Sequence, residues 1–343
     1  MPTSCLVPPG VLHRIARNGS PEQRQWALDT LALDASLRSS RAVQAARGPA
    51  RPAAAALSDQ PQRTVYDAGG QQQLPGHAVR HEGGKPTGDP AADEAYDGLG
   101  ATFAFYLEAY DRHSIDDHGL GLVASVHYAD HYDNAFWNGH QMVFGDGDGN
   151  LFQRFTKSLD VIGHELTHGV TEVEAALEYA NQPGALNESI SDVFGSLVKQ
   201  FQLGQTAERA DWLIGADLLA PGVQGVALRS LKAPGTAFDD PVLGKDEQPA
   251  AMAGYVHTAT DNGGVHLNSG IPNHAFFLAA TALGGHAWEV AGRVWYGALR
   301  DGRIRPTARF RTFASATVRV AAQDFDDRTA SLVRDAWHQV GVL

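Results

Sequence analysis

Two histidines and a glutamate within one short stretch carry the strongest chemical signal in this sequence. In VIGHELTHGV, residues 161–170, His164 and His168 stand four positions apart with Glu165 between them. Residues four apart lie on one face of a helix, so both imidazoles could bind a single metal ion. Glu165 would then stand beside the ion, where it could take a proton from a metal-bound water. The alternative is a helix that carries two histidines by chance, and this motif alone does not decide between them.

A second polar stretch offers a third ligand. GALNESISDVFGSLV, residues 184–198, is predicted to form a helix with Glu188 and Asp192 on one face. Glu188 could complete a set of three protein ligands and leave the fourth position to water, as catalytic zinc requires. Asp192 could accept the free ring N–H of a ligand histidine and fix its tautomer. The alternative is that both carboxylates are solvated charges on a helix surface.

Composition limits the kinds of protein that could use such a site. The 343 residues are 43% hydrophobic and 19% charged, which predicts a globular protein of two or three domains. The net charge of −12 argues against a nucleic acid partner, and no apolar run approaches the ~20 residues of a membrane span. The N-terminal residues lack the apolar core of a Sec signal peptide, so we expect a cytoplasmic protein or export by another route.

The secondary-structure elements that would position the site change in type along the chain. A short helix is predicted after Pro8-Pro9, and a second helix is predicted with Ser20 as N-cap and Gln23 completing a capping box. Residues 38–62 indicate a flexible linker, rich in Ala, Arg, Pro and Ser. Strand-like and helical patterns mix over 63–157, and helical patterns dominate from 158 onward.

Three separated segments resemble the zinc and proton-relay region of thermolysin-like neutral metallopeptidases. They are HELTHGVTEVEAALEYANQPGALNESISDVFG (164–195), DNAFWNGHQMVFGDGDG (133–149) and DNGGVHLNSGIPNHAF (261–276). The resemblance runs from about residue 63 to the C-terminus. It implies an α+β, thermolysin-like two-domain metallopeptidase, with an N-terminal α/β domain, a C-terminal mainly helical domain and the active-site cleft between them. It also implies a bacterial zinc endopeptidase that cleaves proteins or peptides on the amino side of bulky apolar residues.

The resemblance assigns roles to matching residues. His164, His168 and Glu188 would bind one catalytic zinc ion, with Asp192 behind them, and Glu165 would activate the water. Tyr179 and His266 would donate hydrogen bonds to the oxyanion, and Asp261 would orient His266. The residues implied to bind substrate are Asn134, Ala135 and Phe136 beside an extended peptide, Asn187 and Arg229 just after the scissile bond, and Phe152, Phe155, Val161, Ile214 and Leu228 in an apolar specificity pocket. For the five pocket residues, ordinary core packing is the alternative.

One departure concerns calcium. Asp160 and Asp211 match two ligands of the double calcium site in thermolysin, but Lys199 replaces a bridging glutamate. A lysine cannot bind calcium and the carboxylates are too few. We therefore expect no calcium at the double site and predict that the ammonium of Lys199 pairs with Asp160 or Asp211.

The N-terminus departs as well, because CLVPPGVL (5–12) resembles the short pro-region of protealysin-like precursors. The implied division is a helical pro-region plus linker over 1–56, an N-terminal α/β domain over 57–172 and a C-terminal helical domain over 173–343. The pro-region would occupy the substrate groove in cis, with Cys5, Pro8, Pro9 and Leu12 as inhibitory residues. Either the Cys5 thiolate binds the zinc ion, or it fills an apolar pocket.

A second class of function stays open at this point. The chain could be a non-catalytic peptide-binding protein whose groove is permanently occupied. The presence of Glu165, Tyr179 and His266 favours the enzyme, because a pseudoenzyme would be expected to lose one of them.

Overall fold

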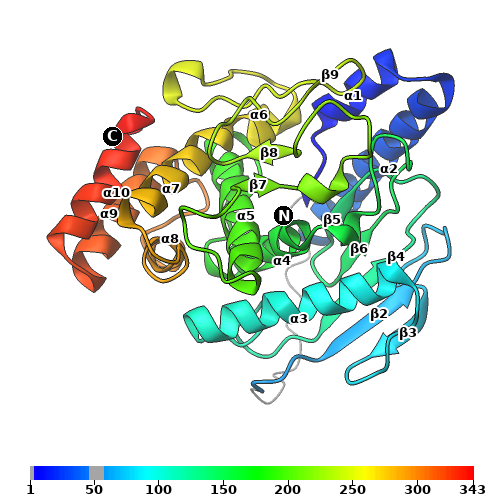
Figure 1. Cartoon of the computed structure of the whole chain (residues 1–343), viewed down its shortest axis with the longest axis horizontal. Coiled ribbons are helices and arrows are strands. Elements are labelled where there is room, and N and C mark those ends of the chain that lie inside the picture. The colour runs from blue at the N-terminus through cyan, green and yellow to red at the C-terminus, as the bar shows by residue number, and fades with distance from the viewer. Residues whose placement is uncertain (1–3, 46–57) are drawn as a thin grey trace.

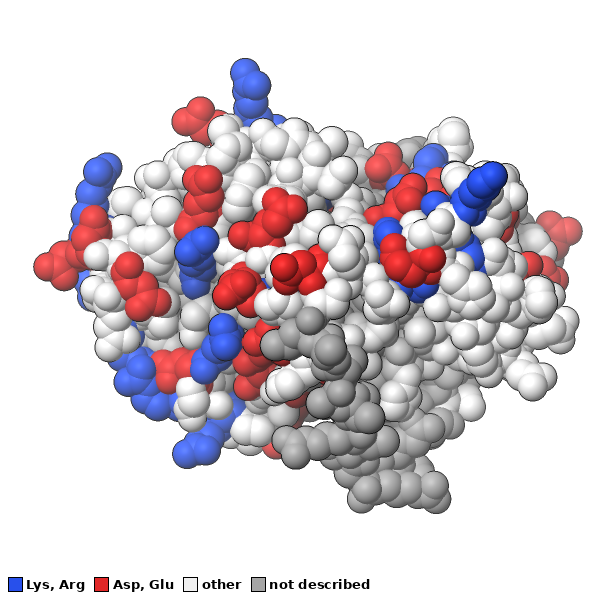
Figure 2. Space-filling view, turned by 90° about the horizontal axis from the view of Figure 1, so that it is seen from below, with Lys and Arg blue, Asp and Glu red and all other residues white. Residues whose placement is uncertain are grey.

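The computed structural model describes the backbone of residues 4–45 and 58–343, with side chains for residues 5–37 and 58–343. A mixed sheet lies beside a mainly helical half, and the N-terminal unit lies at one end (Figure 1). Among these described residues, no helix combines the length and the apolar character that crossing a membrane requires. On the face drawn in Figure 2, acidic and basic side chains are interspersed among large neutral areas.

The N-terminal unit contains a short strand and two helices. β1 is Ser4–Cys5, α1 is Pro9–Asn18 and α2 is Pro21–Ala45. The predicted capping box is confirmed, because Ser20 N donates to Gln23 Oε1 (2.8 Å) and Gln23 N donates to Ser20 Oγ (3.3 Å).

The helix α2 extends further than predicted, to Ala45. The linker predicted from residue 38 is wrong over 38–45, where the chain stays helical. Alanine and arginine recur there, and both are strong helix formers. The enzyme's expected preference predicts two places where the linker could be cut before an apolar residue, Ala42-Val43 and, preferred because it leaves the folded body intact, Ala56-Leu57. The first lies within this helix, and the second lies outside the described residues.

A six-stranded sheet forms the centre of the next unit. Its strand order is β1, β5 (Ala135–Trp137), β6 (Met142–Phe144), β4 (Leu122–Val126), β2 (Arg63–Asp67) and β3 (His77–His81). β4 pairs in parallel with β2 and β6, and the other neighbours are antiparallel. The N-terminal strand β1 is therefore an edge strand added to β5.

The two faces of this sheet are covered differently. α3 (Pro90–Tyr110) and α4 (Leu159–Glu174) pack against one face, and Ala135 and Trp137 belong to the main hydrophobic core there. Phe136, between them, belongs to a separate small cluster that includes Leu33 of α2. The period-two alternation of β5 thus divides its side chains between the two cores.

The C-terminal part is mainly helical. α5 (Asn181–Gln202) packs along α4 and is buried over most of its length. The helices that follow are α6 (Asp261–Asn268), α7 (Gly270–Leu283), α8 (Ala291–Leu299), α9 (Phe310–Asp324) and α10 (Asp327–Gln339). The shorter elements are η1 (Phe155–Lys157), β7 (Leu213–Ile214), η2 (Ala216–Leu218), β8 (Arg229–Ser230), β9 (Asp239–Asp240), β10 (Gly244–Lys245) and η3 (Met252–Gly254). The predicted α+β class, preceded by a small helical unit, is confirmed.

Candidate active site

A close helix crossing builds the centre of the site. Gly195 of α5 faces the backbone of α4, and a Cβ at this position would lie 2.3 Å from Asp160 O and 2.9 Å from His164 N. Only glycine lets the two backbones approach this closely. The crossing brings the histidines of α4 against Glu188 of α5.

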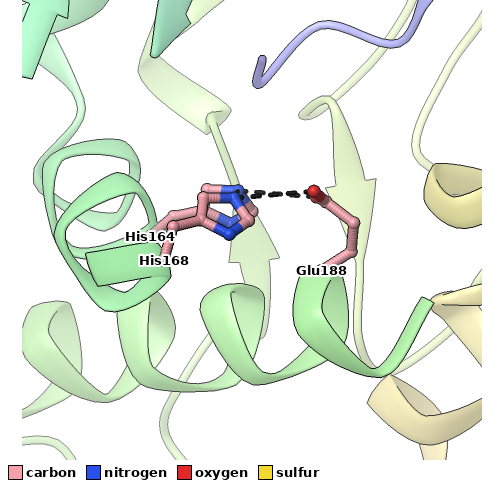
Figure 3. A group of neighbouring side chains, drawn as sticks. All are labelled: His164, His168 and Glu188. Atoms are coloured by element: carbon pink, nitrogen blue, oxygen red, sulfur yellow. Dashed lines mark hydrogen bonds and ion pairs between the residues drawn. The ribbon is translucent and has the colours of Figure 1, made fainter. Parts of the chain in front are cut away.

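His164, His168 and Glu188 converge as the sequence predicted (Figure 3). Their ligand atoms all lie within 4.8 Å of one another, and all three side chains are buried. The two Nε2 atoms are 3.1 Å apart, close to the ~3.3 Å that bonds of ~2.05 Å at a tetrahedral angle require. Glu188 Oε2 is buried without a hydrogen-bond partner among the described residues. Two imidazoles and a carboxylate arranged in this way fit a zinc ion.

A second layer fixes the ring tautomers. His164 Nδ1 lies 2.8 Å from Asp192 Oδ1, and His168 Nδ1 lies 2.7 Å from Asn187 Oδ1. With the protons on Nδ1, both Nε2 lone pairs face the metal position. Burial lowers the pKa of His168 to about 3, which keeps this ring neutral, as a ligand must be. The structure thus places Asn187, which the resemblance assigned to substrate, behind a metal ligand.

Glu188 is ionised at neutral pH. Burial alone would raise the pKa of its carboxyl group, but the neighbouring His266, His168 and His164 outweigh burial and lower the pKa. Its Oε1 also accepts the hydroxyl hydrogen of Tyr179. The group therefore offers a carboxylate to a cation.

Tyr179 and His266 stand together on the other side of the metal group. The Tyr179 hydroxyl lies 3.2 Å from His266 Nε2, and His266 Nδ1 lies 2.6 Å from Asp261 Oδ1. Burial opposes protonation of His266, yet Asp261 and Glu188 raise its pKa to about 9. Burial and Glu188 raise the pKa of Tyr179 well above its ordinary value, so its hydroxyl stays protonated. Both side chains are therefore hydrogen-bond donors at neutral pH.

A strained segment holds His266 in place. Asp261, Asn262, Gly263 and Gly264 have φ values of 52°, 50°, 86° and 75°, all left-handed. The left-handed conformation costs conformational free energy at Asp261 and Asn262, because a Cβ disfavours it. The turn lets Asp261 Oδ2 accept the backbone N–H of His266 (2.9 Å) while Oδ1 contacts the ring.

The N-terminal strand occupies the groove beside β5. Cys5 pairs with Phe136, and Leu6 N donates to Ala135 O (3.2 Å). Val7 N donates to Asn134 Oδ1 (2.8 Å). The three residues predicted to hold an extended peptide thus hold residues 5–7 of the same chain.

Carbonyl groups of this strand meet the charged side chains of the site. Cys5 O lies 3.0 Å from His266 Nε2, and Arg229 Nη1 donates to Leu6 O at 3.0 Å. Arg229 is itself buried and fixed by Asp192, to which its Nε and Nη2 donate at 2.8–3.1 Å. Burial lowers the pKa of Arg229, but Asp192 outweighs it and raises the pKa above the usual value.

Glu165 lies next to the same groove. Its Oε2 accepts the backbone N–H of Trp137 at 3.0 Å, and the side chain is fully buried. This contact ties the predicted base to β5, the strand that holds the peptide.

The predicted specificity pocket is apolar and buried. Its five side chains are at most 3% exposed and belong to the main core together with Leu6, which is 0% exposed: Phe152, Phe155, Val161, Ile214 and Leu228. Leu6 of the N-terminal segment is thus buried in the same core as the residues assigned to the pocket.

The four predicted inhibitory residues lie in different surroundings. Leu12 is buried in the main core, and Pro8 precedes α1, which begins at Pro9. The Cys5 side chain packs in the small cluster with aromatic residues such as Tyr128 and Phe136. Among the described residues, its sulfur is outside the group of atoms that converge at the metal position. This placement corresponds to the apolar-pocket alternative.

Lys199 makes the ion pairs that the sequence suggested. Its Nζ lies 2.8 Å from Asp160 Oδ2 and 3.0 Å from Asp211 Oδ1, and it also donates to Leu213 O at 2.8 Å. Burial lowers its pKa, but Asp160 and Asp211 together outweigh burial and raise the pKa. All three ammonium hydrogens thus have acceptors.

Two supporting residues, Asp34 and Asn273, were not predicted from the sequence. Asp34 of α2 is buried and accepts from Tyr132 Oη (2.6 Å) and from Asn134 Nδ2 (3.0 Å). Asn273 of α7 donates to Asp192 Oδ2 at 2.9 Å. The signal for Asp34 was its spacing from Ala27 and Thr30, which places all three on one helix face.

Fold and site together define a metalloendopeptidase with its groove filled by its own N-terminus. Two family models match the chain: "Thermolysin metallopeptidase, catalytic domain" over residues 52–172 and "Thermolysin metallopeptidase, alpha-helical domain" over residues 175–342. The chain belongs to the thermolysin family of metallopeptidases.

Individual relatives are similar over almost the whole chain. An extracellular metalloprotease of Pectobacterium carotovorum subsp. carotovorum is 54% identical over 341 residues, covering 99% of this chain and 97% of the relative. Protease PrtS of a Photorhabdus strain is 47% identical over 339 residues, covering 98% and 91%. The solved precursor of protealysin from Serratia proteamaculans is 55% identical, with a TM-score of 0.91 and coverage of 99% and 100%. The predicted likeness to precursors with a short pro-region is thereby confirmed.

Proposed function

We propose that this chain is the latent precursor of a zinc endopeptidase, with a pro-region over residues 1–56 and a catalytic body over 57–343. The observation that carries the proposal is the contact of Cys5 O with His266 Nε2 beside the His164, His168 and Glu188 group. The substrates are proteins or peptides with a bulky apolar residue just after the scissile bond. This preference is supported by the buried, apolar side chains assigned to the pocket and by the burial of Leu6 in the same core.

The mechanism follows from the positions of the side chains. His164, His168 and Glu188 would hold a zinc ion, which when bound would supply Lewis acidity and lower the pKa of the attacking water. Glu165, fixed on Trp137 N, takes the proton of that water and passes it to the leaving amine.

Three further side chains hold the peptide during this reaction. Tyr179 and His266 donate to the carbonyl oxygen as its negative charge develops. Arg229 holds the next carbonyl along the peptide and is kept rigid by Asp192. Preorganised donors of this kind stabilise the charge without rearrangement in the transition state.

Two finer points belong to the same proposal. Calcium is absent from the region of Asp160 and Asp211, because Lys199 occupies the space between their carboxylates. The enzyme acts outside the cell, as the name of a relative supports.

The test uses the body after release of the pro-region. Glu165→Gln should retain one zinc ion per chain, measured by elemental mass spectrometry, and hydrolyse a Leu-containing peptide ~10²–10⁴-fold more slowly. Glu208→Gln, an exposed glutamate outside the site, should keep wild-type activity. A wild-type body that binds zinc and peptide but cleaves nothing would instead identify the non-catalytic binding protein.

A further inference from the structure

The N-terminal strand lies in the groove as an extended peptide with one register. β1 is antiparallel to β5, with Ser4 opposite Trp137 and Cys5 opposite Phe136. Three successive hydrogen bonds continue that register: Leu6 N to Ala135 O, Val7 N to Asn134 Oδ1, and Asn134 Nδ2 to Val7 O at 3.4 Å. The direction and the register of residues 4–7 are therefore fixed by both backbone and side-chain contacts.

The two carbonyl groups of Cys5 and Leu6 identify the bond that the site presents for reaction. Cys5 O lies 3.0 Å from Nε2 of His266. The same Nε2 lies 3.2 Å from the hydroxyl of Tyr179, and this hydroxyl donates a hydrogen bond to Glu188. Leu6 O instead accepts a hydrogen bond from Arg229 Nη1, and the guanidinium of Arg229 is held by Asp192. The carbonyl beside the metal group and the oxyanion donors is thus that of Cys5, and the adjoining bond is Cys5–Leu6.

The side chains on either side of this bond fit the same register. Leu6 is fully buried in the main core, where the apolar specificity residues lie. Cys5 is 3% exposed and packs on the opposite face of the sheet with Tyr128, Tyr132 and Phe136. An apolar residue after the bond is the preference already assigned to this site.

We propose that the Cys5–Leu6 peptide bond is itself a substrate of this active site, cut in cis within the intact precursor. The inference rests on the proposed function. One water molecule is consumed: its oxygen bonds to the Cys5 carbonyl carbon, the C–N bond to Leu6 breaks, and Cys5 leaves as a carboxylate. Both protons of the water reach the Leu6 nitrogen: Glu165 carries the first from the attacking water, and the second is released when the new Cys5 carboxyl group ionises. The nitrogen thereby becomes an ammonium group, and no oxidant or reductant is needed.

The cut does not release the pro-region. Behind Leu6, α1 is anchored through Val11, Leu12 and Ile15, each at most 3% exposed. Arg14 Nε donates to Leu243 O (2.6 Å), and its Nη1 pairs with Glu247 (2.8 Å). The segment that begins at Leu6 therefore stays in the groove as a bound product, and the nicked precursor remains latent until the linker is cut.

The single cysteine of the chain makes a direct test possible. Precursor labelled with carbonyl-¹³C cysteine gives one labelled carbonyl resonance, that of Cys5. In Glu165→Gln precursor, adding zinc should shift this resonance while the peptide bond stays intact. His164→Phe in the same background removes a ligand, and zinc should then leave the resonance unmoved.

Wild-type precursor with zinc should next convert that amide resonance to a carboxylate resonance. Intact mass and N-terminal sequencing should show a fragment ending at Cys5 and a new N-terminus at Leu6. The rate should be independent of precursor concentration and at least ~100-fold lower in Glu165→Gln. Leu6→Gly, which removes the buried side chain, should also slow the cut.

The outcomes separate this inference from the proposed function. If the released body cleaves a free peptide but the precursor keeps Cys5–Leu6 intact and shows no zinc-dependent shift, the inference is overturned and the function stands. A rate proportional to precursor concentration overturns the assignment in cis. If the released body cleaves nothing, the proposed function fails first.

Discussion

The ammonium group of Lys199 lies 2.8 Å from Oδ2 of Asp160, a carboxylate that is 1% exposed. The other oxygen of Asp160 accepts from Ser158 Oγ (2.8 Å) and from Gly215 N (3.1 Å). Both oxygens of this buried carboxylate are therefore occupied, and its charge is balanced by a single lysine.

The first prediction concerns this ion pair. Lys199→Met should lower the free energy of unfolding by ~3–5 kcal/mol, because it leaves a buried charge without compensation. Urea unfolding in a Glu165→Gln background, which suppresses autolysis, measures the loss. Asp211→Asn is the matched control and should cost under ~1 kcal/mol, since Asp211 is 46% exposed. A large calcium-dependent rise in the wild-type unfolding temperature would contradict the proposal that the Lys199 ion pairs replace calcium.

The second prediction concerns the tautomer of His164. Asp192→Asn should weaken zinc binding ~10–100-fold, because the carboxylate that orients the His164 ring is lost. Chelator competition on the precursor measures the affinity. Asn273→Ala removes another partner of Asp192 but leaves the carboxylate in place, so its effect should be smaller. Equal zinc affinities for wild type and Asp192→Asn would show that Asp192 does not contribute to zinc binding.

The third prediction concerns latency. Asp34→Ala should raise the activity of the uncut precursor toward a small peptide at least ~10-fold, because two buried hydrogen bonds that dock α2 on Tyr132 and Asn134 disappear. Initial rates are compared with intact mass, so that only uncut precursor is counted. Asp29→Ala, an exposed position on the same helix, should leave latency unchanged. Full latency in both variants would show that α2 is dispensable for inhibition.

The fourth prediction concerns pH. Burial and the charge of Asp148 raise the pKa of Asp133 well above its ordinary value, and Oδ1 of Asp133 has no hydrogen-bond partner among the described residues. The folded state thus keeps a proton that the unfolded state releases above about pH 4, so stability falls as pH rises. Asp133→Asn does not titrate and should be more stable than wild type at pH 7 by ~1–2 kcal/mol, with a smaller difference at pH 4. The free energy of unfolding of wild type and of Asp133→Asn is measured at pH 4 and at pH 7. A difference between the two proteins that becomes smaller as pH rises would contradict the prediction.

The sequence predicted local features better than distant pairings. The spacing of His164 and His168, and the capping box at Ser20, depend on residues within one helical turn, and both are as predicted. The two residues of β1 carry no strand signal of their own, because their pairing with β5 joins segments about 130 residues apart. Asp34 was missed for a related reason: its partners Tyr132 and Asn134 belong to another unit of the chain. Residues 38–45 were misread because a composition rich in alanine and arginine suits a linker as well as a helix.

The position of β1 at the end of the sheet also bears on solubility. An unpaired edge strand exposes N–H and C=O groups that invite pairing with other chains, and proteins usually blunt such edges with charge, proline or a bulge. In β5 the sequence is Ala-Phe-Trp, and those remedies would destroy the surface that must pair with extended peptides. While β1 is in place, the edge of β5 is not available to pair with other chains. We therefore expect the precursor to stay in solution at concentrations at which the released body, without substrate, precipitates.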